Sequence, residues 1–205
     1  YFEAYHHAID VVAQGNLRKD SLLDNVSIKL SELHPRYEPS QQHTVLPELI
    51  TRLLTLVKKA KLLNVPITID AEEQFRLDIS LQVFESVLSH QEIANWGEFG
   101  IVIQAYGKRA LSILHWLHAL SDKLQVTIPV RIVKGAYWDS EIKWAQELGL
   151  EEYPVFTQKH STDLNYLACA RFLLTEGQSG LKAKFATHNA WTVQYIIDLQ
   201  SPVKY

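Results

Sequence analysis

The sequence has 205 residues, of which 47% are hydrophobic and 21% are charged, and its net charge is −3. This composition is typical of a soluble globular domain, and the lack of a basic excess argues against a nucleic-acid partner. The single cysteine, Cys169, excludes an internal disulfide and fits a reducing compartment. Its apolar helical surroundings indicate a packing role. No run of about 18 apolar residues occurs, so no transmembrane segment is predicted.

Short β-rich runs alternate with helical patterns along the chain. The predicted strands cover residues 26–30, 66–70, 100–105, 126–133 and 182–187, with a weaker candidate at 154–157. The predicted helices cover residues 47–64, 75–87, 111–124, 138–148 and 191–199, and another, capped by Ser161 or Asp163, ends at residue 174. Gly149 is predicted to close the helix at 138–148.

This repetition places the chain in the α/β class, with a parallel sheet and helical crossovers. Two architectures compete, a doubly wound open sheet and a (β/α)₈ barrel. Five strands are convincing, whereas a complete barrel typically needs about 250 residues. The pattern alone therefore leaves a small open sheet or an incomplete barrel.

Polar residues follow strand after strand at the carboxyl ends, where ligands gather in both architectures. A purely structural sheet has no need of such groups at one end. Arg131 is the hardest to explain by structure alone, because a guanidinium between Val130 and Ile132 needs a buried partner. An anionic cofactor or a carboxylate would supply one. Gly135 removes a side chain where backbone can approach a ligand.

Structural explanations compete for several of these residues. Asp70 fits a cap of the following helix, and Glu72 and Glu73 fit its first turn, where carboxylates suit the helix dipole. Lys29 can also be explained as a solvent-facing residue, and His188 as a core histidine whose ring nitrogens are hydrogen-bonded. The nine histidines show no metal-ligand spacing, so no metal site is predicted. No glycine-rich dinucleotide loop or phosphate loop occurs.

Six stretches, in this order, resemble the FAD-dependent proline dehydrogenase domain. They read "SIKLSELHPRY", "ITIDAEE", "VIQAY", "RIVKGAYWDSEIKWAQ", "EEYPVFTQKHSTDLNYLACA" and "FATHNA". The stretch "VKGAYWDSEIK" is most similar to the form in bifunctional bacterial proline utilization A proteins. The resemblance extends over nearly the whole chain, from about residue 1 to residue 200.

The resemblance implies a distorted (β/α)₈ barrel that binds FAD at the carboxyl ends of its strands. It implies oxidation of L-proline to Δ1-pyrroline-5-carboxylate in proline catabolism to glutamate, with a hydride passed to the flavin and electrons passed on to membrane quinone. It also implies an oligomeric parent protein that is cytoplasmic and peripheral at the inner membrane face. In the bifunctional form, a second domain oxidises the product, as glutamate semialdehyde, to glutamate.

The resemblance also implies roles for individual residues. Those expected to contact FAD are Ala71, Gln104, Arg131, Val133, Lys134, Gly135, Ala136, Trp138, Thr187, His188 and Asn189. Arg131 would stabilise negative charge on the reduced ring, and Gln104 would bind the isoalloxazine edge. Asp70, Arg131 and Tyr137 form the expected catalytic group. Lys29 would lie near the proline carboxylate, and Tyr137 would wall the proline pocket.

The chain is expected to be one incomplete barrel domain over residues 1–205, corresponding to about strands two to six of the family barrel. We expect it to be a fragment with little activity of its own, because an arginine pair that clamps the proline carboxylate in the family has no counterpart before Tyr205. Two alternatives remain open. One is a non-catalytic fragment that needs complementation by missing strands, and the other is an aldolase-like barrel with Lys29 or Lys134 as a Schiff base.

Overall fold

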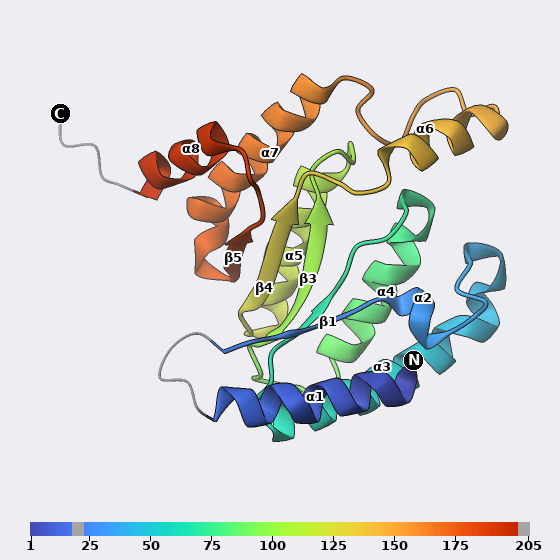
Figure 1. The fold of residues 1–205 in the computed structure, drawn as a ribbon, viewed down its shortest axis with the longest axis vertical. Coiled ribbons are helices and arrows are strands. Elements are labelled where there is room, and N and C mark those ends of the chain that lie inside the picture. The colour runs from blue at the N-terminus through green and yellow to red at the C-terminus, as the bar shows by residue number, and fades with distance from the viewer. Residues whose placement is uncertain (18–22, 201–205) are drawn as a thin grey trace. The chain divides into compact units, whose positions relative to one another are not determined.

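The fold is known from a computed structural model, which describes residues 1–17 and 23–200 (Figure 1). Helices and strands alternate along the chain. The helices are α1 (Phe2–Asn16), α2 (Leu30–Leu33), α3 (Gln42–Leu62), α4 (Leu77–Leu88), α5 (Ala110–Leu124), α6 (Trp138–Glu147), α7 (Lys159–Leu174) and α8 (Ala190–Gln200). The strands are β1 (Val26–Ile28), β2 (Ile67–Ile69), β3 (Phe99–Gln104), β4 (Ile128–Val133) and β5 (Leu181–Phe185). Three short 3-10 turns are η1 (Pro39–Gln41), η2 (Gln74–Arg76) and η3 (Glu176–Ser179).

The five strands form one sheet in the order β1-β2-β3-β4-β5. β1 pairs with β2 and β2 pairs with β3, both in parallel. Val26 lies opposite Ile67, and Ile67 lies opposite Phe99. A doubly wound sheet reverses its strand order at a switch point, whereas a (β/α)₈ barrel adds each strand beside the last. The sequential order therefore decides between the two predicted architectures in favour of a partial (β/α)₈ barrel.

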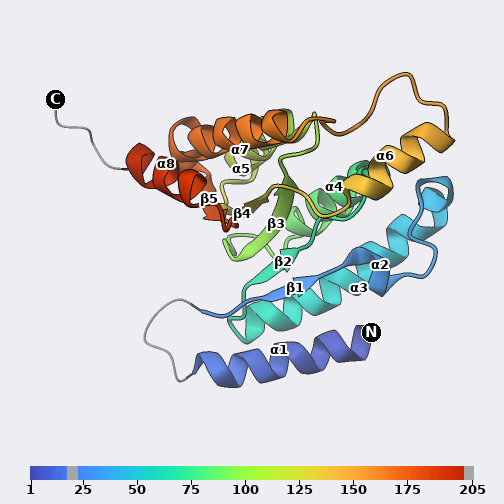
Figure 2. The same cartoon turned by 45° about the horizontal axis from the view of Figure 1, so that its top comes forward.

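The chain forms two compact units. The first contains residues 1–101 and 124–129. Its α1 and α3 lie side by side next to β1 (Figure 2), and its core includes the fully buried rings of Phe84 and Phe99, whose centroids are 5.0 Å apart.

The second unit contains residues 102–123 and those from 130 onward. Here α7 packs on α8 and β5, and its buried face includes Tyr166, Cys169 and Leu173. Burial raises the pKa of the Cys169 thiol to about 12. The predicted packing role of this cysteine is confirmed, because a buried thiol is a poor nucleophile.

Element boundaries differ from the predictions where short turns adjoin a helix. The first strand ends at Ile28, because Leu30 already begins α2. The helix predicted from Pro47 starts at Gln42, since η1 leads directly into it. The helix predicted from residue 75 starts at Leu77, after η2.

Two further predictions fail and one succeeds. The weak strand at 154–157 is only an isolated bridge between Gly107 and Val155. The predicted caps of α7 are wrong, because the helix begins earlier, after Gln158. Gly149 does follow α6 with φ of +62°, as predicted for a closing glycine.

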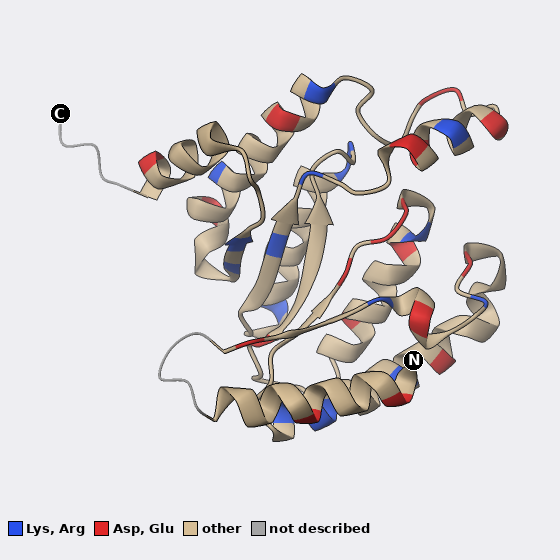
Figure 3. Cartoon of the chain, in the orientation of Figure 1, with Lys and Arg blue, Asp and Glu red and all other residues tan. Residues whose placement is uncertain are grey.

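Among the helices of the described residues, none is both long and apolar enough to cross a membrane. The segment between β2 and α4 contains acidic residues, coloured red on the ribbon in Figure 3. These acidic residues follow the carboxyl end of a central strand, at the edge where the sequence predicts a site.

Candidate active site

The predicted site residues divide between the two units. Lys29, Asp70 and Ala71 belong to the first unit. The others belong to the second: Gln104, Arg131, Val133, Lys134, Gly135, Ala136, Tyr137, Trp138, Thr187, His188 and Asn189. Each group forms a local arrangement of its own.

Lys29 and Asp70 occupy equivalent positions at the ends of neighbouring strands. Each follows the last register pair, in which Ile28 lies opposite Ile69. The backbone N–H of Asp70 donates to the Ile28 carbonyl at 2.9 Å, so the ladder continues one residue beyond the strand. Asp70 is half-buried, and Lys29 is exposed. The solvent-facing prediction for Lys29 is confirmed, whereas the alternative that Asp70 caps the next helix is wrong, because Arg76 precedes α4.

Tyr5 of α1 contacts the segment that begins with Lys29. Its hydroxyl donates to Glu32 at 2.5 Å and accepts from the Lys29 backbone N–H at 3.0 Å. Burial, followed by the hydrogen bond to Glu32, raises the pKa of Tyr5 well above its ordinary value. The tyrosine is therefore a neutral donor at physiological pH, and it fixes the backbone from which the Lys29 side chain extends.

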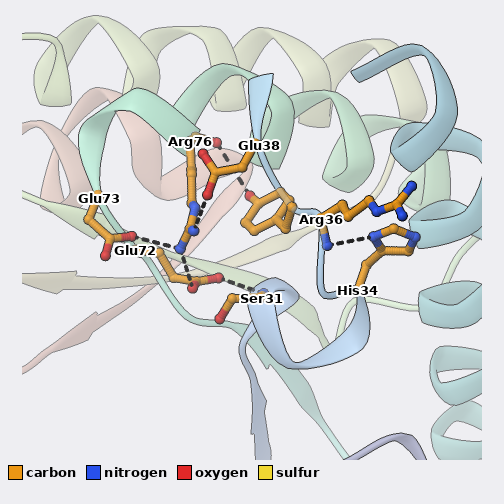
Figure 4. A network of polar contacts seen from close by, with 8 residues as sticks. Ser31, His34, Arg36, Glu38, Glu72, Glu73 and Arg76 are labelled. Carbon is orange, nitrogen blue, oxygen red and sulfur yellow. Dashed lines mark hydrogen bonds and ion pairs between the residues drawn. The ribbon is translucent and has the colours of Figure 1, made fainter. Parts of the chain in front are cut away.

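A second polar network in the same unit is centred on Arg76 (Figure 4). The guanidinium binds Glu38 at 2.7 Å, Glu73 at 3.0 Å and Glu72 at 3.5 Å. The other carboxylate oxygen of Glu72 accepts from the backbone N–H of Ser31 at 3.0 Å. The prediction that Glu72 and Glu73 form the first turn of the next helix is wrong, because both precede η2 and bind Arg76.

In the second unit, the ends of β3 and β4 are joined by backbone hydrogen bonds that extend past the strands. Ala105 donates to the Val133 carbonyl at 2.8 Å, and Tyr106 donates to the Lys134 carbonyl at 2.7 Å. The buried side chain of Gln104 then accepts from the Ala136 backbone N–H at 3.1 Å. The structure thus brings predicted residues of two different strands together.

Gly135 lies in this joined region with φ of +140°, a conformation that L side chains rarely adopt. A Cβ built at this position would lie 2.4 Å from the ring of Tyr106. The ring is buried, and its hydroxyl contacts the buried carboxylate of Glu141 at 3.4 Å. Burial, followed by the charge of Glu141, raises the pKa of Tyr106 well above its ordinary value. Tyr106 stands in the stretch "VIQAY", but its packing against Gly135 was not predicted from the sequence.

A cavity of about 450 Å³ opens beside this loop. Its lining residues are Tyr106, Lys134, Gly135, Trp138, Asp139, Thr157, Lys159, Thr162 and Asp163. Three of them, Lys134, Gly135 and Trp138, were predicted site residues. Thr157, Lys159 and Asp163 were not predicted as site residues, although they stand in one of the stretches that carry the family resemblance; Asp163 was predicted only as a possible helix cap.

Two lysines from different elements bind one carboxylate at this cavity. Lys134 and Lys159 both pair with Asp163 of α7, the latter at 2.7 Å. The hydrogen bonds from Lys134 and then from Lys159 lower the pKa of Asp163 below its ordinary value. The cavity lining as a whole contains two lysines and two aspartates, because Asp139 lines it as well. Each lysine can still donate a hydrogen bond to an anionic ligand group.

Trp138 starts α6 and is 41% exposed, so its ring is available at the cavity. Its indole N–H donates to the Phe156 carbonyl at 2.8 Å, which fixes the direction of the ring. Tyr137 precedes it and is half-buried. Of the two neighbouring aromatic residues Tyr137 and Trp138, Trp138 lines the cavity.

Arg131 and Val133 lie on one face of β4 and are half-buried, whereas Ile132 on the opposite face is fully buried. The sequence predicted a buried guanidinium at Arg131, but the residue is only half-buried. The strand has one fully packed face and one that is partly open, and Arg131 lies on the open face. A half-buried cation on that face is still suited to a ligand of negative charge.

Thr187, His188 and Asn189 connect β5 to α8. The Thr187 hydroxyl accepts from the Asn189 backbone N–H at 3.1 Å, and the Asn189 side chain accepts from the Thr192 backbone N–H at 3.0 Å. Asn189 therefore caps α8. His188 is exposed, so the alternative of a core histidine is wrong.

No cluster of three or more histidine, cysteine, aspartate or glutamate side chains among the described residues is suited to hold a metal ion. Two histidines of α5 lie against an aromatic ring of α7. His115 and His118 both contact the ring of Phe172, with centroid distances of 4.2 Å and 6.1 Å.

Residues 1–204 match the protein family described as proline dehydrogenase. The chain is 44% identical over 200 residues to the bifunctional protein PutA of Escherichia coli, covering 97% of the chain and 15% of that protein. It is 33% identical over 141 residues to mitochondrial proline dehydrogenase 2 of Arabidopsis thaliana, covering 67% of the chain and 29% of that protein. A crystal structure of a mutant of Bradyrhizobium japonicum proline utilization A has a TM-score of 0.94 and 44% identity, covering 98% of the chain and 21% of that protein. The chain thus spans only a small part of the PutA proteins that it matches.

Proposed function

The chain belongs to the proline dehydrogenase family, and we propose that its complete gene product oxidises L-proline to Δ1-pyrroline-5-carboxylate with FAD as cofactor. In this reaction a hydride leaves the ring carbon next to nitrogen and a proton leaves the nitrogen, so that a C=N bond forms. FAD, when bound, accepts the hydride. Residues 1–205 would supply an incomplete barrel domain, about strands two to six, and the rest of the polypeptide would complete it.

The residues around the cavity of the second unit fit part of such a cofactor. The aromatic side chain of Trp138, which is 41% exposed, offers packing surface for a planar ring system. The two lysines around Asp163 and the hydroxyl of Thr157 offer charge and hydrogen bonds for a phosphate or ribityl group. The observation that carries the proposal is this cavity, because four residues of its wall, Lys134, Gly135, Trp138 and Asp139, stand in one of the stretches that carry the family resemblance.

Several residues of the second unit have proposed roles that follow from their positions. Gln104 would hydrogen-bond the edge of the flavin while it holds the Ala136 backbone. Arg131 would stabilise negative charge on the reduced ring. Tyr137 would wall the proline pocket. The same proposal assigns cofactor contacts to Val133, Lys134, Gly135, Ala136, Trp138, Thr187, His188 and Asn189.

The residues of the first unit have proposed roles toward the substrate. Lys29 would lie near the proline carboxylate, Asp70 would orient cationic groups of the pocket, and Ala71 would touch the flavin. The register of β1 and β2 supports a joint role of the first two, because it places them in equivalent positions at neighbouring strand ends. Their task is to hold the hydride-donating carbon in a fixed position, since positioning is the protein's main contribution to hydride transfer.

We also propose that electrons pass from the flavin to a membrane quinone, at the inner membrane face of the cytoplasm. Relatives named bifunctional PutA support the further proposal that a second dehydrogenase domain in the same polypeptide oxidises the product. We propose that this polypeptide forms an oligomer. The 205 residues alone would then have little activity.

The test is an absorbance spectrum of the complete gene product and, in parallel, of the 205-residue chain. Each is incubated with FAD, desalted, and measured before and after L-proline is added without oxygen. We expect the complete product to retain flavin and to lose its visible absorbance with L-proline but not with D-proline. If the complete gene product retains no flavin, or if L-proline does not bleach its flavin, the proposed function is contradicted.

A further inference from the structure

Arg76 is surrounded by three carboxylates that come from two separate loops (Figure 4). Glu38 lies in the connection between α2 and η1, whereas Glu72 and Glu73 lie in the connection between β2 and η2. The Arg76 side chain is only 18% exposed. Burial alone would lower the pKa of the guanidinium, but the carboxylates, with Glu38 and Glu73 foremost, raise it. The cation is therefore permanently charged and binds the two loops to each other.

Aromatic rings fix the orientation of the same guanidinium. Its central carbon lies 5.3 Å from the ring centroid of Tyr37 and 5.0 Å from that of Phe75. The Tyr37 hydroxyl also donates to the Arg76 carbonyl at 3.3 Å. Among the buried side-chain nitrogen and oxygen atoms of the described residues, the Nε of Arg76 is the one without a hydrogen-bond partner. The two Nη groups thus make all the ion-pair contacts, and the rings hold the plane that aims them.

Glu72 extends the network to the segment that begins with Lys29. Its side chain is only 6% exposed, with one oxygen 3.5 Å from Arg76 and the other accepting from the Ser31 backbone N–H at 3.0 Å. Ser31 is two residues beyond Lys29, and Glu72 is two residues beyond Asp70. The contact therefore joins the two loops immediately after the residues with proposed substrate roles.

We propose that Arg76 is a positioning residue that holds Asp70 and Ala71 at a fixed distance from Lys29. This inference rests on the proposed function, which gives these three residues their tasks. Without Arg76, the three carboxylates would lose the guanidinium that all of them bind, and the Glu72 side chain, only 6% exposed, would lose that ion pair. The loops after β1 and β2 would move apart, and the substrate pocket would lose its geometry without any change in the residues that line it.

The test uses the Arg76→Gln variant of the complete gene product, compared with Arg36→Gln. Arg36 belongs to the same region, is exposed, and contacts His34 through its backbone N–H, a contact that the substitution keeps. For Arg76→Gln we expect the KM for L-proline to rise about tenfold or more at unchanged flavin content, because loss of positioning weakens substrate binding. Hydrogen exchange should accelerate at the backbone N–H groups of Ser31 and Asp70. Arg36→Gln should change neither readout.

Milder variants keep the inference testable if Arg76→Gln does not fold. Arg76→Lys keeps the charge but loses the planar fork, and Glu38→Gln removes a single carboxylate. Each should raise the KM by a smaller factor at wild-type flavin content. A kcat/KM within twofold of wild type, with unchanged exchange at Ser31 and Asp70, would overturn the inference.

Failure of the proposed function would be recognised separately, because the wild-type protein itself would then not be bleached by L-proline. Hydrogen exchange alone would decide in that case. Faster exchange at Ser31 and Asp70 in Arg76→Gln, but not in Arg36→Gln, would support the positioning of these loops by Arg76. Equal exchange in the two variants would refute it.

Discussion

The loops that follow β1 and β2 are held by charged side chains, whereas the loop that follows β4 is held by its own backbone and by the ring packed against Gly135. In the first case a single guanidinium binds three carboxylates. In the second, hydrogen bonds from Tyr106 and Ala136 and a positive φ at Gly135 determine the conformation. The two regions should therefore respond to different kinds of substitution.

A loop held by ion pairs tolerates changes in volume but not in charge. A loop held by backbone and shape tolerates surface charge changes, but not an added methyl group. The difference also fits the proposed roles, because small ionic substrates are recognised by side chains, while a flat cofactor ring needs backbone and glycine at close approach. Three substitutions in the second unit test this contrast.

The largest effect is expected from Gly135→Ala. The new methyl group would lie 2.4 Å from the Tyr106 ring, and the backbone would keep an unfavourable φ of +140°. We expect a loss of about 3 kcal/mol in the stability of the loop and loss of flavin, because the buried ring cannot move aside without strain. Thermal unfolding and flavin content of the complete gene product measure this effect.

Gly149→Ala is the matched control, since Gly149 also has a positive φ, of +62°, but nothing lies within 4 Å of an added Cβ. It should cost about 1 kcal/mol and leave flavin content unchanged. Equal effects of the two substitutions would mean that backbone conformation alone, rather than the Tyr106 ring, requires the glycine.

The order of the five strands and of the helices α3 to α8 was predictable from the sequence, because apolar periodicity and turn residues are local signals, whereas the four-residue α2 was not predicted. Their exact ends were not, since short turns such as η1 and η2 add no periodic pattern. In the site, Lys134, Gly135 and Trp138 could be predicted, because they stand together in one motif and reach one cavity.

The missed residues depend on partners far away in the sequence. Arg76 binds Glu38, which is 38 positions away, and Tyr5 binds Glu32, which is 27 positions away. No local pattern identifies such pairs, because an isolated arginine or tyrosine on a helix reads as an ordinary surface residue. They become visible only once the fold places α1 beside α2 and the loop after β1 beside the loop after β2.

An intermediate effect is expected from Tyr106→Phe, which keeps the ring against Gly135 and removes only the hydroxyl. The buried Glu141 carboxylate loses a donor, at 3.4 Å, and the cost should be about 1–2 kcal/mol. Tyr153→Phe is the control, since its hydroxyl accepts an exposed hydrogen bond from Gln146 at 3.2 Å, and its cost should lie below about 0.5 kcal/mol. Hydrogen exchange of the loop after β4 measures both variants. An unperturbed loop in Tyr106→Phe would show that the ring alone supports Gly135.

The smallest effect, and one that depends on pH, is expected from Asp163→Asn. Lys134 and Lys159 lower the pKa of Asp163 below its ordinary value of 3.8, so the folded protein binds its proton less readily than the unfolded chain. The stabilisation is therefore fully present above pH 3.8 and is lost as the pH falls through the lower, folded-state value. Because the side chain is 35% exposed, the difference between wild type and variant should be below about 1 kcal/mol at pH 6.

This difference is measured by hydrogen exchange of α7 between pH 6 and pH 3, corrected for the intrinsic exchange rate. It should shrink toward pH 3, and 0.5 M salt should reduce it at pH 6, because the carboxylate is partly screened by solvent. A difference that stays constant down to pH 3 would mean that Asp163 supports α7 through packing or neutral hydrogen bonds. In that case the stabilisation of α7 would not depend on the ion pairs of Asp163 with Lys134 and Lys159.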